Sequence, residues 1–556
     1  MGEVAGVAET LSEFVAAALA RVLPAGSAGA DPLVRRSDRA DYQSTVALAV
    51  ARVAGTSPVA LAGALAREVP GAVVSGPGFL NLTAPDGLIW SRIALRTADS
   101  RLGVGTPLAG GRTVIDYSAP NAAKEMHVGH LRSTVIGDAL ARVLAHLGAD
   151  VVRQNHLGDW GTQFGMLIQY RMEHPQTPDA ELYPLARKAF DSDGDFAGRA
   201  RERVVALQSG DEPTRAVWRD LVAWSEHSFQ VLYERLGVLL VPSDDAPESM
   251  YNPQLEGVVS ELAERGFAVE SQGAWCVFLP GRDAPLIVRK KDGGFGYAAT
   301  DLAALRYRVR DLGADRILYV IDPRQALHLS MVFDTARLAG WLPDGVDVVH
   351  VAFGTVLGPD GRPFKSRAGD TVPLRELLDA AVDRARTVIT DLDDSLVQAV
   401  AIGAVKYADL SSSRTKDYAF DLDRMMSFTG NTSVYLQYAH ARVRSIQARL
   451  DGEHRVDGEH RVDAALDLHP AERELALRLD GFGATLQEVA QTLEPHRLCG
   501  YLFELAQAFS RFFEQCPVLR ADTAQRQANR VALVRLTGDT LAQGLNLLGI
   551  AAPFPM

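Results

Sequence analysis

The chain of 556 residues has few cysteines, only Cys276, Cys499 and Cys516. No two of them form a Cys-x-x-Cys pair, and no histidine stands beside them at ligand spacing. This scarcity argues against a disulfide framework and against a zinc knuckle. We expect three ordinary buried thiols and no dedicated metal site in the protein.

Long apolar runs and targeting signals are also missing. No apolar run reaches the roughly 18 residues that a membrane helix needs. The first residues carry Glu3, Glu9 and Glu13 in place of a basic region, and Gly6 stands where N-myristoylation requires serine or threonine. The sequence therefore predicts a globular cytoplasmic protein without membrane attachment.

Positive charge is in deficit, with 57 lysines and arginines against 69 acidic residues and a formal net charge of −12. This balance excludes a protein that coats nucleic acid indiscriminately. A polynucleotide partner remains compatible with it, because phosphate contacts need only a local basic surface. With 47% hydrophobic residues, the chain can bury large cores, and its length suggests about three or four domains.

The most informative stretch runs from Arg112 to Leu144. A β-branched run, Thr113-Val114-Ile115, leads into a loop and then into His127-Val128-Gly129-His130, after which apolar residues keep helical spacing. Strand, loop and helix follow in the order of a parallel nucleotide-binding sheet. The helix start favours an anion and the glycine allows close backbone approach. The stretch therefore predicts a phosphate site for ATP.

Further strand and loop segments extend this pattern. A strand at Val151-Val152 precedes a glycine-rich loop at 155–165, and ligands of such folds bind at the carboxyl edge of the sheet. We expect the second half of the sheet to begin near Leu286-Ile287-Val288 and to continue at 317–321. A helix between these strands carries Tyr297 and Asp301 on one face. The sequence thus predicts a site split across both halves.

One stretch resembles the signature of class I aminoacyl-tRNA synthetases, and within them the arginyl-tRNA synthetases. It consists of Ser118-Ala119-Pro120-Asn121, then Lys124, the histidine motif and Arg132-Ser133. The resemblance spans nearly the whole chain. It implies an α/β fold, in which residues 109–376 form a Rossmann-like parallel-sheet catalytic domain with an insertion at about 172–269. Residues 1–108 would be an N-terminal α+β domain that contacts tRNA, and 377–556 a C-terminal all-α anticodon-binding bundle.

The resemblance also implies an activity, the ligation of arginine to tRNA. L-Arginine and ATP would give arginyl-adenylate and pyrophosphate, and the arginyl group would pass to the 3′ end of tRNA(Arg). ATP is expected as its Mg²⁺ complex, with no tightly bound cofactor, and the family-based expectation is a monomer. A nucleotidylyltransferase shares His-x-Gly-His but should lack the tyrosine-bearing C-terminal helix, whereas a non-housekeeping or non-catalytic tRNA-binding paralogue is the standing alternative.

A guanidinium needs planar, bidentate carboxylate partners. Carried over residue by residue, the resemblance implies an arginine pocket drawn from both halves of the sheet: Asp116, Ser118, Asn121, Tyr297, Asp301 and Gln325. The expected ATP-binding residues lie in the histidine motif and in two later segments: His127, Gly129, His130, His328, Phe364 and Lys365.

The loop after the last predicted strand departs from the family pattern. Aligned on Ser366, the two usual lysine positions hold Phe364 and Arg367. In arginyl enzymes with this variant, a lysine just ahead of the histidine motif is thought to compensate, and Lys124 stands there. Stabilisation of charge in the transition state is therefore assigned to Lys124 with help from Lys365 or Arg367. The two histidines, His127 and His130, complete the predicted catalytic set.

Beyond about residue 377 the sequence predicts helices to the end of the chain. One of them, over 432–450, carries Tyr435, Tyr438 and Arg442 at helical spacing. Such a stripe is more often core than binding face, but it also suits stacking on splayed bases beside phosphates. The resemblance favours a role at the anticodon loop. A six-residue direct repeat at 452–463 is interpreted as a tolerated surface insertion.

Overall fold

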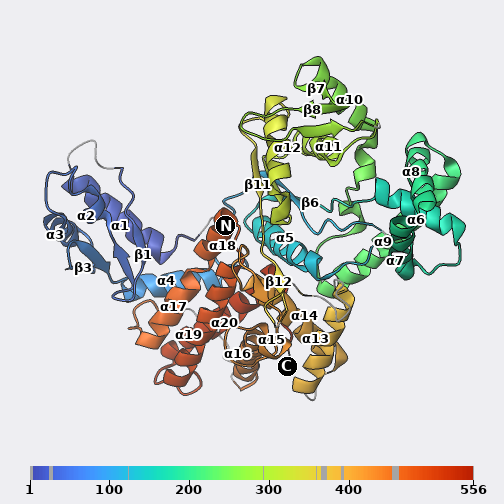
Figure 1. Ribbon diagram of the computed structural model, residues 1–556. Helices are drawn as coiled ribbons and strands as arrows, with labels where there is room; N and C mark the ends of the chain where they lie inside the picture. Colours follow the sequence, from blue (N-terminus) through green and yellow to red (C-terminus); the bar gives the residue numbers. More distant parts are fainter. Residues whose placement is uncertain are drawn as a thin grey trace.

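The computed structural model describes residues 4–23, 29–122, 124–291, 293–358, 360–362, 364, 372–389, 393–453 and 462–554, without the side chains of residues 162 and 451–453. Lys365 and Arg367, and residues 454–461 of the repeat, lie outside this description. An N-terminal module, a central sheet with two outlying subdomains and a C-terminal set of helices follow one another along the chain (Figure 1).

The N-terminal module packs three helices against a four-stranded antiparallel sheet of order β1-β2-β4-β3. Its elements are α1 (Val7–Val22), β1 (Val34–Arg36), β2 (Tyr42–Ser44), α2 (Val46–Val50), α3 (Pro58–Glu68), β3 (Ala72–Ser75) and β4 (Phe79–Leu82). Helix α3 begins where the sequence predicts, because Pro58 occupies the first turn and the Ser57 hydroxyl accepts the Ala60 N–H. The predicted α+β architecture is confirmed.

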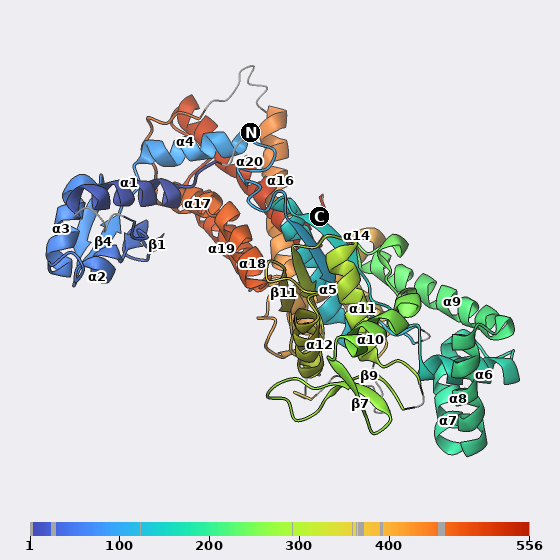
Figure 2. The same cartoon turned by 90° about the horizontal axis from the view of Figure 1, so that it is seen from above.

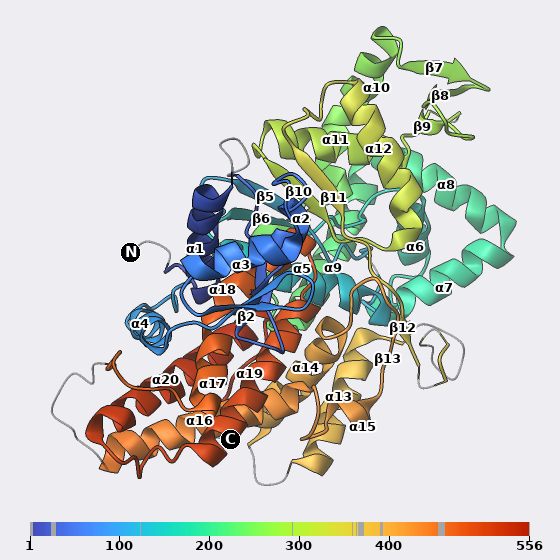
Figure 3. The ribbon, with the colours of Figure 1, turned by 90° about the vertical axis from the view of Figure 1, so that its left-hand side faces the viewer.

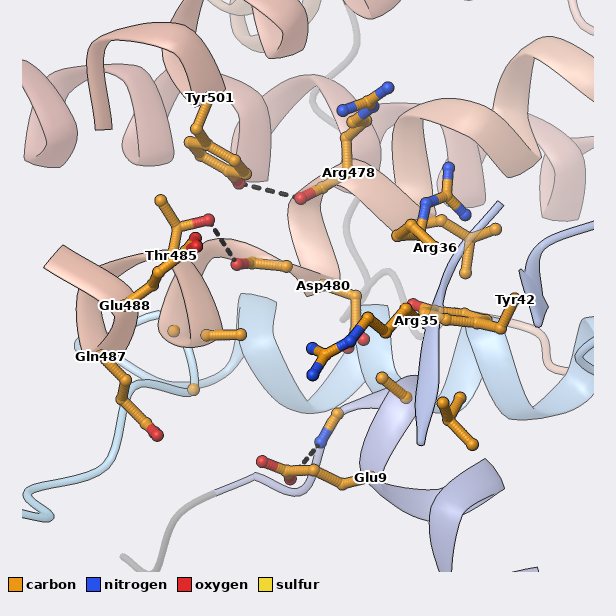
Figure 4. Close-up of a pocket in the computed structure, with 18 of the residues that line it drawn as sticks. Glu9, Arg35, Arg36, Tyr42, Arg478, Asp480, Thr485, Gln487, Glu488 and Tyr501 are labelled. Atoms are coloured by element: carbon orange, nitrogen blue, oxygen red, sulfur yellow. Dashed lines mark hydrogen bonds between the residues drawn. The ribbon is translucent and has the colours of Figure 1, made fainter. Parts of the chain in front are cut away.

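Helix α4 (Asp86–Thr97) joins this module to the C-terminal helices. Arg96 forms a buried ion pair of 2.9 Å with Asp480, and the Trp90 indole donates to the Leu466 carbonyl. A cavity of about 550 Å³ lies at this junction (Figure 4). Arg35 from β1, Arg478 from α17 and Glu488 from α18 line it. The cavity lies away from the central sheet.

The central sheet is wholly parallel, with strand order β11-β10-β5-β6. It comprises β5 (Arg112–Asp116), β6 (Asp150–Gln154), β10 (Arg316–Tyr319) and β11 (Asp347–His350), joined through α5 (Val128–His146) and α12 (Ala326–Leu338). Because the chain leaves β5 toward β6 and leaves β10 toward β11, the strand order reverses between β5 and β10. The loops after these two strands therefore meet at a topological switch point, where ligands bind in such folds.

The predicted start of the second half-sheet at Leu286-Ile287-Val288 is wrong. These residues belong to β9 (Leu286–Arg289), the edge of a separate antiparallel sheet with β7 (Ala268–Ser271) and β8 (Ala274–Val277). Leu286 and Val288 are buried, whereas Ile287 is 47% exposed, so the strand is half-buried and not enclosed like a parallel one. Its short apolar run does not distinguish these two cases.

A helical insertion lies beside the central sheet, at the end of the molecule opposite the N-terminal module (Figure 2). Its elements are α6 (Thr162–Glu173), α7 (Asp179–Ser192), α8 (Gly194–Ser209), α9 (Glu212–Leu236), η1 (Pro242–Asp244), η2 (Glu248–Tyr251) and α10 (Asn252–Glu264). Helices α6–α9 bury a core of their own, while α10 packs against α11 (Tyr297–Arg310). Long α9 returns the chain to the sheet (Figure 1).

The C-terminal part is helical, with helices α16, α17, α19 and α20 packed side by side (Figure 3). Its elements are β12 (Val356–Leu357), α13 (Leu374–Val388), α14 (Asp394–Leu410), β13 (Tyr418–Ala419), α15 (Leu422–Met425), α16 (Ser433–Glu453), α17 (Pro470–Asp480), α18 (Phe482–Thr492), α19 (His496–Gln515) and α20 (Ala524–Leu547). Buried Arg132 on α5 pairs with Asp409 on α14. Within the described residues, no helix has the length and apolarity to cross a membrane.

Candidate active site

Helix α5 begins at the histidine motif, and the two imidazoles build its N-terminus. The Nδ1 atom of His127 accepts the Gly129 N–H at 3.0 Å, and Nδ1 of His130 accepts the His127 N–H at 3.1 Å. Since Nδ1 accepts in both rings, the neutral tautomer carries its proton on Nε2. A Cβ at residue 129 would lie 2.8 Å from the His127 ring. The motif thus presents two Nε2–H donors at a helix N-terminus.

Electrostatics keep these rings neutral. Burial lowers the pKa of His127 and, with the neighbouring His127 ring, lowers that of His130 to about 3; the Lys124 ammonium adds to both shifts. Neutral imidazoles at a helix N-terminus can donate hydrogen bonds to an anion without losing a proton to it. The arrangement suits phosphate oxygens.

The loop after β5 turns sharply toward this helix. Ser118 and Ala119 both have positive φ, +72° and +47°, a conformation that costs non-glycine residues free energy. The turn is held by polar contacts from other segments: Ser118 N–H donates to Ser133 Oγ, Ala119 N–H donates to Asn155 Oδ1, and Ser133 Oγ donates to the Val320 carbonyl. The buried Ser118 hydroxyl itself meets Tyr233 and Thr134.

A second loop, after β6, runs beside this turn. Ala122 N–H donates to the Gly158 carbonyl, and a Cβ at residue 158 would lie 2.2 Å from Asn121 Oδ1. Asn121 is exposed at this edge. The glycine therefore permits the two loops to approach and leaves the Asn121 amide exposed at the carboxyl edge of the sheet.

Carboxyl groups gather around Asp301 on α11. Asp301 on α11 contacts His328 Nε2 at 2.5 Å and lies 4.0 Å from His156 Nε2. The hydrogen bond to Asp301 raises the pKa of His328, whereas burial lowers that of His156. The sequence assigned His328 to ATP, but the structure joins it to the predicted arginine-pocket residue Asp301.

Glu248, at the start of η2, is a member of this cluster that sequence reasoning missed. Burial raises its pKa to about 8, and the nearby carboxylates of Asp301 and Asp159 add to the shift. Within the described residues, Glu248 forms no ion pair. A buried carboxyl group whose pKa is raised in this way gains a favourable partner when a cation binds beside it.

Asp116 has a different environment from the one the sequence suggested. It is 2% exposed and accepts a 2.8 Å hydrogen bond from Nη2 of the fully buried Arg308, whose Nε donates to Gln154. Its other oxygen, Oδ1, is buried without a partner. Asp116 therefore already holds a guanidinium that belongs to the chain.

The remaining predicted residues of the arginine pocket are exposed. Tyr297, the first residue of α11, is 67% exposed, and Gln325, which precedes α12, is exposed as well. Phe364 packs its ring edge-on against Phe420 and donates its N–H to the Val356 carbonyl. The phenylalanine at the first lysine position thus contributes packing to the base of the loop.

The predicted tRNA stripe lies on α16. Tyr438 is 52% exposed and meets Phe428 edge-on, while the half-buried Tyr435 meets Phe503. The guanidinium of Arg442 lies over the Phe513 ring at 5.3 Å. One tyrosine is therefore free to stack on a base, and the other also packs against the neighbouring helix.

Three family models match this chain. The model described as tRNA synthetases class I (R), catalytic domain, matches residues 105–422, which include the histidine motif and the carboxylate cluster. The arginyl tRNA synthetase N terminal domain matches 9–84, and the DALR anticodon binding domain matches 436–556. The chain belongs to the arginyl-tRNA synthetases. It is thus an aminoacyl-tRNA ligase with the class I fold, as the sequence predicts.

Curated arginyl-tRNA synthetases are similar over their full lengths. The arginine–tRNA ligase of Frankia casuarinae is 59% identical over 576 residues, 97% of each chain, and that of Streptomyces avermitilis is 48% identical over 594 residues, 100% of each. Among solved arginyl-tRNA synthetases, the Plasmodium falciparum structure has a TM-score of 0.84 at 26% identity and covers 100% of each chain. The Thermus thermophilus structure has 0.82 at 24% identity, with 99% of this chain and all of the other covered, and supports the fold.

Proposed function

We propose that the cleft activates L-arginine with ATP and transfers it to tRNA(Arg). The arginine carboxylate attacks the α-phosphorus, the bond between the α-phosphorus and the bridging oxygen breaks, and pyrophosphate leaves with the bonding electron pair. A ribose hydroxyl of the tRNA 3′ end then attacks the arginyl carbonyl and releases AMP. No protein nucleophile is needed, so positioning and charge stabilisation carry both steps.

At the phosphate end, the proposed donors are the Nε2–H groups of His127 and His130 and the N-terminal N–H groups of α5, with Gly129 giving access. Lys124 supplies the charge that opposes the negative charge developing on pyrophosphate. Lys365 and Arg367 keep the supporting roles that the sequence assigns them. Magnesium enters with ATP as part of the substrate complex.

At the other end, the guanidinium of arginine meets Asp301, with Glu248 as a second carboxylate. This proposal is supported by the raised pKa of Glu248 and by the lack of an ion pair for it among the described residues. Asp116 acts indirectly, because it fixes Arg308 beneath the pocket. His328 orients Asp301 through their hydrogen bond.

The rim residues complete the arginine site. Asn121 and the Ser118 turn face the amino-acid backbone, and Tyr297 and Gln325 close over the side chain. These assignments are supported by the position of both loops at the switch point between β5 and β10. The anticodon loop is proposed to contact Tyr435, Tyr438 and Arg442 of α16. Residues 1–108 are proposed to contact another part of the tRNA.

The observation that carries the proposal is the placement of neutral N–H donors at the N-terminus of α5 and, around Asp301, of carboxyl groups that no arginine or lysine pairs among the described residues. We expect the protein to act as a monomer in the cytoplasm. Its activity is tested by arginine-dependent exchange of labelled pyrophosphate into ATP, with and without tRNA(Arg). Exchange is expected only with both arginine and tRNA present. No exchange in either condition would support the non-catalytic paralogue, and full exchange without tRNA would contradict the subgroup assignment.

A further inference from the structure

Lys124 rests on an aromatic ring from the helical insertion. Its Nζ lies 4.4 Å from the centroid of the Tyr183 ring, within the distance at which a ring face attracts a cation. Tyr183 lies on α7, far from Lys124 in sequence. Among the described residues, Lys124 forms no other hydrogen bond or ion pair. The tyrosine is therefore the contact that defines where this ammonium lies.

The ring and the lysine loop share one core. Ala122, two residues before Lys124, is buried in the same apolar cluster as Leu182 and Ala186 of α7, and Tyr183 packs against that cluster. Because both partners are anchored in one packed core, the ring is a fixed platform for a long and otherwise mobile side chain.

The ring contact also leaves the ammonium within electrostatic reach of the histidines. The charge of Lys124 lowers the pKa of both His127 and His130, while its ring contact is with the insertion. Loss of the ring would free the lysine to point into solvent, where a flexible ammonium is well hydrated.

We propose that Tyr183 is a positioning residue for adenylation, which holds the Lys124 ammonium at the phosphate end of the cleft. This inference rests on the proposed role of Lys124 in opposing charge on pyrophosphate. Tyr183 itself touches no reacting atom and acts only through the lysine. The helical insertion thereby contributes to catalysis in a way that its own sequence does not reveal.

The test uses the full-length protein in tRNA-supported pyrophosphate exchange. Tyr183→Leu and Tyr183→Gln, which lack the ring, should lower kcat about three- to tenfold and leave the KM for arginine unchanged. Tyr183→Phe, which keeps the ring face, should retain wild-type activity. Phe190→Leu is the matched control, because Phe190 lies on the same helix but stacks on Arg187 and Arg201. Thermal melting identifies variants that misfold.

A double-mutant cycle separates this inference from the proposed function. In a Lys124→Ala background, Tyr183→Leu should cause no further loss of kcat. If Lys124→Ala retains wild-type activity, the role of the lysine fails, and the inference with it. If Lys124→Ala is impaired while both ringless variants are normal, or while their losses persist in the Lys124→Ala background, only the inference about Tyr183 is overturned. Faster exchange by the ringless variants would also overturn it.

Discussion

Burial has opposite consequences at the two ends of the proposed site, the N-terminus of α5 and the surroundings of Asp301. At the N-terminus of α5, burial lowers the pKa values of His127 and His130, so neutral rings offer N–H donors to an anion. Beside Asp301, burial raises the pKa of Glu248, so a bound cation would stabilise the ionised form of its carboxyl group. Desolvation disfavours the charged form of each side chain. A buried histidine is therefore neutral and can donate a hydrogen bond to an anion, whereas a buried carboxyl group is stabilised in its charged form by a bound cation.

The two ends also differ in how their charges are balanced. The Lys124 ammonium contacts the Tyr183 ring face and forms no ion pair among the described residues, as the phosphate role proposed for it requires. Asp116 is neutralised by the chain itself through Arg308, whereas Asp301 and Glu248 lack such an arginine among the described residues. A carboxylate near a binding site is therefore a weaker ligand candidate when, like Asp116, it is already paired with an arginine, whose charge is permanent.

Removal of the phosphate-end charge should give the largest kinetic effect. Lys124→Ala should fold normally and bind ATP and arginine with little change, because the lysine acts mainly in the transition state. Its adenylation rate should fall about 10²–10³-fold, as for loss of one preorganised donor. Single-turnover adenylation measures this, and Arg367→Lys in that background should restore part of the rate. A wild-type rate for Lys124→Ala with a severely impaired Lys365→Ala would move the role to the loop.

At the arginine end, Asp301→Asn should lower kcat/KM for arginine by about 30- to 10³-fold, on the order of 2–4 kcal/mol, because a buried cation would lose its charged partner. Steady-state exchange over a range of arginine concentrations measures it. The KM for ATP serves as the internal control and should change little. An unchanged kcat/KM for arginine would remove Asp301 from the pocket.

Between the two ends, the loop contact at Gly158 should affect stability. Gly158→Ala would place a Cβ 2.2 Å from Oδ1 of the exposed Asn121. Because this amide can rotate away, the expected destabilisation is at most about 1 kcal/mol, the lower end of the cost of overpacking. Gly257→Ala is the matched control, because its Cβ on α10 would meet no atom within 4 Å and alanine favours the helix by about 0.5–1 kcal/mol. Denaturant unfolding should separate the two variants in opposite directions. Equal stabilities would show that the two loops yield readily.

The smallest expected effect is a pH dependence of arginine binding. A bound guanidinium lowers the pKa of Glu248 from about 8, so binding below that pH releases a proton, and affinity rises with pH up to about 8. The slope for one coupled proton is at most about tenfold per pH unit. Calorimetry in buffers of different ionisation enthalpy should detect the proton for the wild type and lose it in Glu248→Gln. An equal proton release by the variant would point to another group.

Much of the fold could be predicted from local sequence signals. Pro58 behind Ser57 marks the start of α3, and the β-branched run before the histidine motif gives β5 and α5. The prediction that Leu286–Val288 begins the second half of the parallel sheet was wrong, because three apolar residues do not reveal which sheet they join. Strand partners are fixed by tertiary packing, which the local pattern does not encode.

The site was predictable only where a motif carried it. The histidine motif and Asp301 were found through spacing and family signature, whereas Glu248 was missed because it stands alone in a turn before Tyr251. No local sequence signal marks this acidic residue as part of the site. The pairing of Asp116 with Arg308 and the contact of Lys124 with Tyr183 join residues far apart in the sequence, which only the packed structure brings together.

The central claim, that Asp301 and Glu248 recognise the positive charge of arginine, is tested most directly by replacing the guanidinium with its neutral isostere. L-Citrulline has nearly the same shape as L-arginine and lacks the positive charge. In tRNA-supported pyrophosphate exchange, we expect a kcat/KM for citrulline at least about 10³-fold below that for arginine. We also expect Asp301→Asn to reduce the ratio of the kcat/KM for arginine to that for citrulline. A citrulline kcat/KM within about tenfold of the arginine value in the wild type would contradict recognition of the charge by Asp301 and Glu248.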